Sequence, residues 1–139
     1  MTSEERFLSY IDKRYFKVDS EGRIWRLARK GRAGSNKWHK LSEPVRAESP
    51  GGQGLYLRVS FVVKGTQHSV AAHRIVFAIL LNKCVLPPLD QLVNHENGNK
   101  TDNHPTNLTL VTPQGNVEHA RYVLKVGPWD AKRREVLIG

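Results

Sequence analysis

The stretch from Leu92 to Ala120, LVNHENGNKTDNHPTNLTLVTPQGNVEHA, constrains the fold of this chain more than any other part of it. It contains the pair Asn94-His95, then Asn107 after eleven intervening residues, and Asn116 after eight more. Polar side chains at such separations can meet at one site only if the backbone between them folds back on itself. Turn-forming residues fill the gaps between these positions, and they predict a turn-rich structure here.

The residues around these positions predict a strand, a loop, a second strand and a helix. Glycine, asparagine, aspartate and proline crowd the segment 96–105, so 91–95 and 108–111 are predicted to be short strands joined by a long polar loop. Thr112 and Pro113 supply an N-cap hydroxyl and a proline suited to the first helical position, so a helix is expected to begin there. At ~100° per residue its apolar face holds Val117, Ala120, Val123 and Leu124.

Asn116 lies within that apolar face of the predicted helix. An amide directed at the core needs partners, because an unpaired buried polar group costs on the order of 1–3 kcal/mol. Two interpretations stay open on the residues alone. Asn116 either bonds to the loop backbone or ligates a metal ion held between the helix and the strands.

Strand, loop, strand and helix carrying Asn-His, Asn and Asn at these separations resemble the HNH nucleases, and most closely the phage and intron-encoded HNH homing endonucleases. The resemblance covers about Ala72 to His119. "AHRIVFAIL" resembles the lead-in "vHRLVAxxF", and "VNHENGNKTDNHPTNLTLVTPQGNVEH" resembles the core "vDHxdGNkxNNxxxNLxwvTxxxNxxH". The resemblance implies an α+β fold in which a β-rich N-terminal half, an antiparallel meander, precedes a ββα-metal HNH core.

The same resemblance implies roles for individual residues. His95 would be the general base, Asn107 would orient the loop and the histidine, and Asn94 and Asn116 would hold Mg²⁺ or Mn²⁺ through their amide oxygens. His119 is either an assisting ligand or phosphate contact, or an ordinary surface histidine. Imidazole suits proton abstraction near neutral pH, and a hard divalent ion bound by oxygen stabilises charge on the phosphate and the leaving group.

Asn94 fits this assignment less well than the other residues, for two reasons. Its position is often aspartate in the family, and an amide brings no charge to a metal site. Asn94 and His95 are also neighbours, whose side chains point to opposite faces of a regular strand. A bent backbone at His95 is therefore predicted. A second hypothesis follows from the neutral Asn94, namely a DNA-binding protein in which the HNH core persists as an inactive scaffold.

Charge points to a polyanionic partner. Lysine and arginine number 22 against 13 acidic residues, a formal net charge of +9. Double-stranded DNA fits this excess and the resemblance, whereas structured RNA is a weaker alternative. A membrane surface is not expected, because the chain shows neither an apolar run of ~18 residues nor an amphipathic lysine-rich helix.

Two further absences limit the class of protein. Cys84 is the only cysteine, so no intramolecular disulfide and no cysteine-ligated structural zinc are possible. The first residues, MTSEERF, do not resemble a secretory signal, which predicts the cytoplasm of a bacterial or phage-infected cell. One site per chain implies that a monomer nicks DNA, and a homodimer would cut both strands.

The front of the chain is predicted to be a helix at 3–13, a hairpin with its turn at 19–22, and strands at 55–63 and 68–71. Between 23 and 42 lies an acid-free basic segment, interpreted as a flexible loop that follows DNA phosphates rather than a solvated connection. The predicted DNA contacts are Arg23, Arg26, Arg29, Lys30, Arg32, Lys37, Lys40 and Arg74.

The chain is accordingly divided into three parts. Residues 1–70 are expected to be a β-rich basic DNA-binding region, 71–125 the HNH nuclease core, and 126–139 a basic C-terminal tail. Within the core, 73–81 is apolar almost all round and predicts a buried helix under the hairpin. His73 at its start is interpreted as a structural hydrogen-bonding residue rather than a ligand.

Overall fold

The computed structural model describes residues 1–31, 37–51 and 56–112 and confirms the predicted α+β class. Helix α1, Ser3–Asp12, opens the chain where the sequence predicts it. It begins at a capping box, in which the Thr2 hydroxyl accepts from the backbone N–H of Glu5 while the Glu5 carboxylate accepts from that of Thr2.

The first sheet has the strand order β1-β2-β3, with β1 at Phe16–Val18, β2 at Ile24–Lys30 and β3 at Trp38–Arg46. The hairpin predicted around 19–22 is confirmed, but most of the basic segment is strand rather than a flexible loop. The prediction of a loop was wrong because β2 buries Ile24 and Ala28 against the core, while the long cations of the segment stay at least partly exposed along the same strand.

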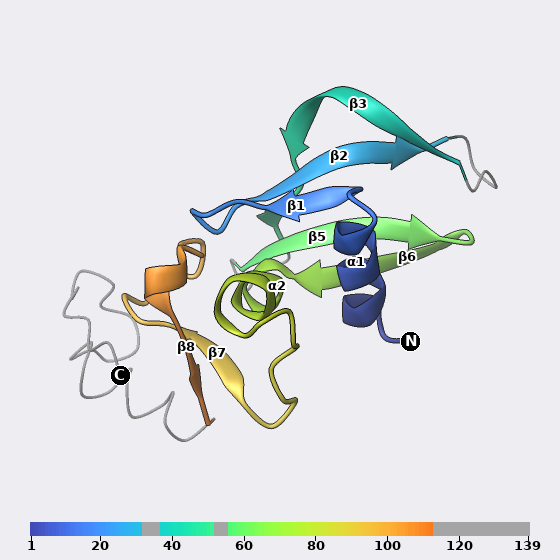
Figure 1. Cartoon of the computed structure of the whole chain (residues 1–139). Helices are drawn as coiled ribbons and strands as arrows, with labels where there is room; N and C mark the ends of the chain where they lie inside the picture. The colour runs from blue at the N-terminus through green and yellow to red at the C-terminus, as the bar shows by residue number, and fades with distance from the viewer. Residues whose placement is uncertain (32–36, 52–55, 113–139) are drawn as a thin grey trace.

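The second sheet has the order β4-β5-β6 and lies below the first in Figure 1. Its strands are β4 at Ser49–Pro50, β5 at Leu57–Val63 and β6 at Thr66–Ala71. Lys64 and Gly65 connect β5 to β6, both at positive φ, as a tight two-residue turn between twisted strands requires.

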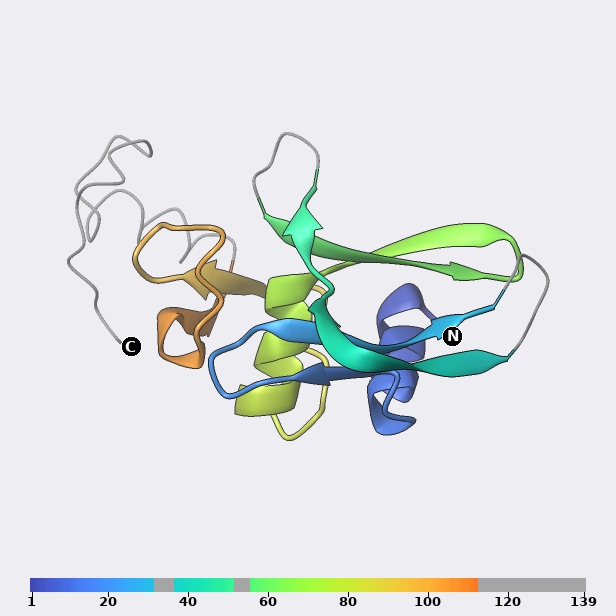
Figure 2. The ribbon, with the colours of Figure 1, turned by 90° about the horizontal axis from the view of Figure 1, so that it is seen from above.

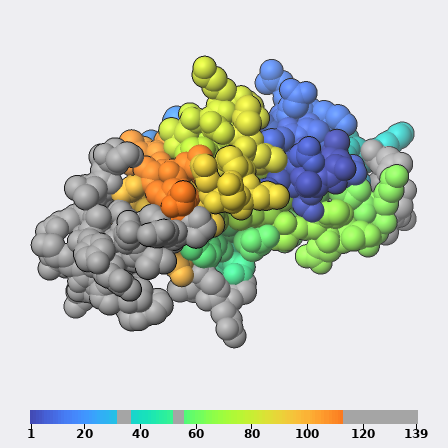
Figure 3. All heavy atoms as spheres, turned by 90° about the horizontal axis from the view of Figure 1, so that it is seen from below, coloured from blue at the N-terminus to red at the C-terminus, as the bar shows by residue number. Residues whose placement is uncertain are grey.

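Helix α2, Ala72–Val76, follows β6 directly and continues as a π-helical turn, η2, at Phe77–Leu81. This confirms the helix predicted at 73–81. The segment that follows, yellow in Figure 3, lies between the N-terminal helix and the orange hairpin. Within the described ranges no helix is long and apolar enough to cross a membrane.

The last described unit is an antiparallel hairpin of β7, Leu92–His95, and β8, Leu108–Val111, with a 3₁₀ turn, η3, at Pro105–Asn107 before β8. Both strands lie where the sequence predicts them. Several predictions fall outside the described residues: the helix after Thr112, the positions Arg32, Asn116 and His119, and the tail at 126–139.

One apolar cluster joins the sheets, the helices and the hairpin. Figures 1 and 2 place α1 and α2 on the same side of the first sheet. The cluster spans both sides of the predicted division at residue 70, so the hairpin packs on the core of the front half. Its buried members are Phe7, Tyr10, Phe16, Ile24, Val59, Phe61, Val63, Val70, Ala72, Ile75, Val76, Phe77, Val93 and Leu108.

Candidate active site

The β7–β8 ladder fixes the two neighbours Asn94 and His95. Asn94 pairs with Thr109, and His95 pairs with Leu108, in regular antiparallel register. Their side chains therefore leave opposite faces of the hairpin. The predicted bend does not appear as a bulge in the ladder; β7 ends at His95 and the chain turns from Glu96 onwards.

The His95 ring is enclosed and held by one hydrogen bond. Its exposed fraction is 5%, and its Nε2 lies 2.7 Å from Oδ1 of Asn103. An amide oxygen can only accept, so Nε2 carries the proton and Nδ1 keeps its lone pair. The rings of His73 and Tyr56 complete the surroundings, with centroids 5.2 and 5.8 Å from that of His95.

Burial lowers the pKa of His95 below its ordinary value, and the positive charge of Lys100 acts in the same direction. The hydrogen bond to Asn103 and the charge of Asp102 oppose that shift. Burial also lowers the pKa of His73, to about 3, with further contributions from His95 and nearby arginines. Both rings are therefore neutral at neutral pH, the state that a general base needs.

Asn107 fixes the loop that carries Asn103. Its Nδ2 donates to Oδ1 of Asn97 at 3.0 Å and to the backbone oxygen of Asp102 at 2.8 Å, while its Oδ1 accepts from the Asn97 backbone at 3.0 Å. Its backbone oxygen also accepts from the N–H of Glu96 at 2.9 Å. Asn107 thus orients the loop, and the bond to the His95 ring comes from Asn103.

The side-chain amide of Asn94 is not fully hydrogen-bonded within the protein. The residue is 8% exposed, and its Nδ2 is buried without a hydrogen-bond partner. Among the described residues no three histidine, cysteine or acidic side chains converge as a metal cluster. An amide oxygen from Asn94 is nevertheless the kind of hard donor that Mg²⁺ and Mn²⁺ accept.

Two residues at the start of α2 differ from the sequence interpretation. Arg74 was expected to reach solvent or phosphate, but its guanidinium lies 2.6 Å from the Glu4 carboxylate and donates to the Pro87 carbonyl at 3.0 Å. It therefore ties α1 to the segment after η2. His73 was expected to make a structural hydrogen bond, yet its Nδ1 is buried without a partner and its ring packs 4.9 Å from Tyr56.

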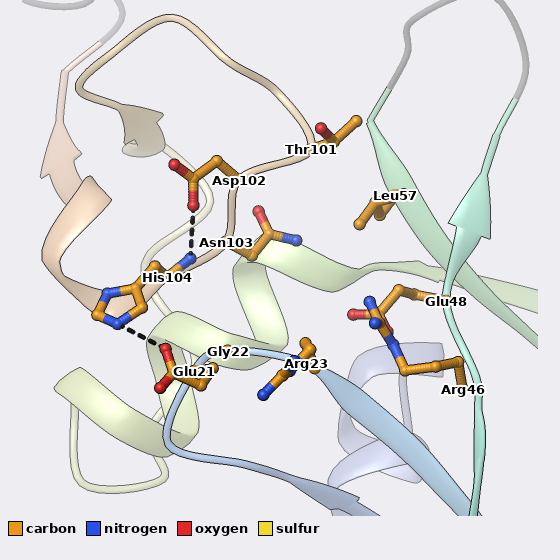
Figure 4. A pocket seen from close by; sticks show the side chains of 10 residues that line it. All are labelled: Glu21, Gly22, Arg23, Arg46, Glu48, Leu57, Thr101, Asp102, Asn103 and His104. Carbon is orange, nitrogen blue, oxygen red and sulfur yellow. Dashed lines mark hydrogen bonds and ion pairs between the residues drawn. The ribbon is translucent and has the colours of Figure 1, made fainter.

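A pocket of about 310 Å³ lies between the β1–β2 turn and the loop that holds Asn103 (Figure 4). Gly22 has φ +81°, and a Cβ there would stand 1.9 Å from the Asn103 backbone oxygen. Next to this contact, Nε2 of His104 lies 3.0 Å from the Glu21 carboxylate. The pocket is lined by Glu21, Gly22, Arg23, Arg46, Glu48, Leu57, Thr101, Asp102, Asn103 and His104.

The predicted DNA-contacting cations of the first sheet fall into two groups. The first group is engaged within the protein: Arg26 covers the Phe16 ring at 4.8 Å, Lys30 lies 5.7 Å from the Trp38 ring, and Arg23 pairs with Asp19 at 3.0 Å. The second group is exposed on β2, β3 and the residue before β3. Its members are Arg29, Lys37 and Lys40.

Sequence reasoning missed Asn103 and Tyr56 as neighbours of His95, and it gave no role to Glu96. Asn103 lies in the polar run TDNHP, where its amide resembles several others nearby. Tyr56 comes from a segment distant in sequence, before β5. Only the backbone path shows which of these side chains reaches the histidine.

Comparison with known proteins adds sequence and structural relatives. The chain is 41% identical over 64 residues to the SPbeta prophage-derived protein YosQ of Bacillus subtilis (strain 168), whose name describes it as an HNH homing endonuclease. The match covers 46% of this chain and 33% of that protein, so the chain spans about a third of the relative's length. No protein-family model matches the chain.

A solved structure, "DNA binding and cleavage by the HNH homing endonuclease I-HmuI", aligns with 76% of this chain and 51% of its own. The identity is 24% and the TM-score is 0.49. The sequence match confirms the resemblance read from the Asn-His, Asn and Asn spacing, since nearly half of the chain is similar to a protein that is named as an HNH homing endonuclease.

Proposed function

We propose that this chain is a metal-dependent HNH endonuclease of the homing or phage type, which hydrolyses phosphodiester bonds of double-stranded DNA. The observation that carries the proposal is the enclosed His95, whose Nε2 is fixed at 2.7 Å from Asn103. This bond leaves Nδ1 as the basic atom of a neutral ring. The relation to a protein named as an HNH homing endonuclease supports the same activity.

In this proposal Nδ1 of His95 takes a proton from the attacking water. The water oxygen bonds to phosphorus while the bond to the 3′ oxygen breaks. As the ring becomes positive, its Nε2–H bond to Asn103 strengthens, and the Asp102 charge favours the imidazolium. Asn107 contributes by holding the loop on which both of these residues lie.

The described part of the proposed metal site fits a hard divalent ion. Asn94 would hold Mg²⁺ or Mn²⁺ through its amide oxygen, because an amide oxygen is a hard donor of the kind that these ions accept. Asn116 is the second proposed ligand, and His119 is the proposed assisting group. The ion, when bound, would neutralise charge on the phosphate and the leaving oxygen.

DNA would lie across the exposed cations of the first sheet. Arg29, Lys37 and Lys40 are the proposed phosphate contacts, within the region 1–70 that we propose as the DNA-binding part. The core at 71–125 would cut, and the tail at 126–139 adds basic charge. With one site per chain, we propose that a monomer nicks one strand in the cytoplasm of its host cell.

Plasmid nicking tests the proposal. Supercoiled DNA is incubated with Mg²⁺ or Mn²⁺ and with the full chain, His95→Ala, or the control His68→Ala, whose histidine lies on β6 beside Phe61. Loss of the general base should slow nicking by about 10²–10⁴-fold, and the control should match the wild type. Equal cleavage by His95→Ala would eliminate the mechanism.

A second function, DNA binding without cleavage, is favoured by one observation. Asn94 is neutral at the position where the resemblance places a metal ligand. This alternative predicts salt-dependent binding of duplex DNA with no metal-dependent nicking by the wild type. Under it, Asn94→Asp would gain nicking activity.

A further inference from the structure

Lys100 lies in the loop between β7 and β8, at a position that hydrogen bonds fix. It is an inner residue of the turn in which the backbone N–H of Asp102 donates to the Asn99 carbonyl at 3.1 Å. The Asp102 carbonyl also accepts from Nδ2 of Asn107 at 2.8 Å. The loop therefore holds the backbone of Lys100 in a defined place, while its side chain is exposed.

The ammonium group of Lys100 lies over the Tyr56 ring, 5.0 Å from its centroid. The same ring packs on His95, with the two centroids 5.8 Å apart. Their chain neighbours, Thr101 and Leu57, both line the pocket of Figure 4. Lys100 is also close enough for its charge to lower the pKa of His95. Lys100 therefore belongs to the surroundings of the His95 ring.

The charge of Lys100 forms no ion pair within the part of the chain that the structure describes. The other cations whose charges act on this group of rings are engaged elsewhere. Arg74 pairs with Glu4, and Nε of Arg58 donates to the Ser69 hydroxyl at 2.7 Å. An aromatic face attracts an ammonium group without occupying its three N–H donors as a carboxylate would. Lys100 is thus a positioned cation whose donors can bind an anion.

We infer that Lys100 donates a hydrogen bond to a non-bridging oxygen of the phosphate that is cleaved, and that Tyr56 is the positioning residue for its ammonium group. This inference rests on the proposed function. Negative charge builds on the non-bridging oxygens as water attacks, and a fixed cation stabilises that charge. Hydrogen bonds of about 2.8 Å and an attack distance of about 3.3 Å place base and cation within roughly 10 Å of each other. The contacts of Tyr56 with both groups allow that spacing.

Single-turnover nicking of supercoiled plasmid, with the full chain in excess and Mg²⁺ present, tests the contact. Affinity for the same DNA is measured with Ca²⁺ in place of Mg²⁺. Lys100→Met removes the charge and keeps the apolar stem, and the matched control Lys13→Met removes an exposed charge at the end of α1. Lys100→Met should nick about 10–100-fold more slowly and lose at most about fivefold in affinity. Lys13→Met should stay within about twofold in both measurements, and Lys100→Arg should recover most of the lost rate.

Tyr56→Leu tests the positioning role, because it removes the ring face and keeps an apolar side chain. Nicking should slow by about three- to tenfold, and less in Tyr56→Phe, which keeps the ring. Adding Lys100→Met to Tyr56→Leu should slow nicking by less than Lys100→Met does in the wild type. If circular dichroism shows that Tyr56→Leu is unfolded, pentafluorophenylalanine at this position replaces it. That ring keeps the shape without the negative face, so nicking should again be slower than in Tyr56→Phe.

The outcomes separate this inference from the proposed function. A wild-type nicking rate in Lys100→Met overturns the role of Lys100 and leaves the proposed nuclease intact. Equal losses of rate and affinity would make Lys100 an ordinary DNA-binding cation, which also overturns the inference. Fully additive losses in the double variant overturn the role of Tyr56. A wild type that binds duplex DNA without nicking it overturns the proposed function, and this inference with it.

Discussion

The loop between β7 and β8 and the hairpin of β2 and β3 are both rich in polar side chains, yet they are built in opposite ways. In the loop, short amides bond to one another and to the backbone, as Asn107 does to Asn97 and Asp102. In the hairpin, long cations lie over aromatic rings, as Arg26 does over Phe16. The first arrangement fixes a backbone around His95, whereas the second covers a core and leaves other cations at the surface.

The contrast teaches that polarity alone does not distinguish a site from a surface. A short side chain with few rotatable bonds loses little entropy when it bonds to a nearby backbone group. A lysine or arginine loses more, and it remains mobile unless a ring or carbonyl holds its stem. Variants of each kind should therefore fail differently.

Asn107→Ala should cost most, because it leaves several loop groups without their partners at once. We expect the free energy of unfolding to fall by about 2–4 kcal/mol and nicking to fall at least tenfold, measured by urea denaturation and by plasmid assay. Asn99→Ala is the control, since within the described part of the chain the Asn99 side chain bonds to nearby Thr101. Equal losses in both variants would show that the loop is not organised around Asn107.

Gly22→Ala tests whether the front half positions the catalytic loop. The new Cβ would meet the Asn103 backbone oxygen at 1.9 Å, so the turn or the loop must move, and Asn103 with it. We expect a loss of about 2–3 kcal/mol in stability and about tenfold in nicking rate. Gly22 and Asn103 lie in separate segments of the chain, and no sequence pattern predicts that they touch.

Gly65→Ala is a matched control for that substitution. Gly65 has nearly the same backbone angle, φ +80°, but a Cβ there would have nothing within 4 Å. This variant should lose only the conformational cost, about 1 kcal/mol, and keep full activity. If Gly65→Ala lowers the nicking rate as much as Gly22→Ala does, the contact with Asn103 is not the cause.

How much the sequence could predict follows the same contrast. Strands β7 and β8 were predictable because turn residues flank two short apolar runs, and His95 stood out through its spacing to Asn107. The basic segment at 23–42 was misread because its cations are as compatible with an exposed strand as with a loop. Composition gives the number of charges in a segment, whereas pairing with neighbouring strands determines whether its backbone is a strand or a loop.

The neighbours of His95 could not be predicted for a different reason. Asn103 is one of several amides in its loop, and which of them reaches the ring depends on backbone turns that Asn107 fixes from the far end. Tyr56 and His73 come from other segments altogether. Local pattern thus identified the proposed general base, while the groups that orient its ring emerge from tertiary structure.

The enclosed histidines should make stability depend on pH. The pKa of His73 is lowered to about 3, well below the value near ~6.5 expected in the unfolded chain. As pH falls through that interval, the unfolded chain binds a proton that the folded chain excludes. Neutral His73 therefore contributes its full stabilisation above pH ~6.5. As pH falls from there toward the folded-state pKa, the free energy of unfolding decreases by up to about 1.4 kcal/mol per pH unit for this group.

His73→Phe removes the titrating group and keeps a planar ring beside Tyr56. Urea unfolding from pH 7 to pH 4 should show a shallower loss of stability in the variant than in the wild type. The slope should not vanish, because burial lowers the pKa of His95 as well. Identical pH slopes in the two proteins would mean that His73 is accessible to protons in the folded state.

The smallest effect is expected from single surface cations, and it tests the hairpin side of the comparison. Arg29→Gln removes an exposed charge, so the slope of log affinity for duplex DNA against log salt should shrink by about 0.9 if Arg29 contacts one phosphate. Arg26→Gln removes a cation that covers Phe16 and donates to the Ser60 carbonyl at 3.4 Å. It should lower stability by about 1 kcal/mol and leave the salt slope unchanged. If Arg26→Gln changes the slope more than Arg29→Gln does, the cations over the aromatic core are the ones that face DNA, and the division between covering and binding charges is wrong.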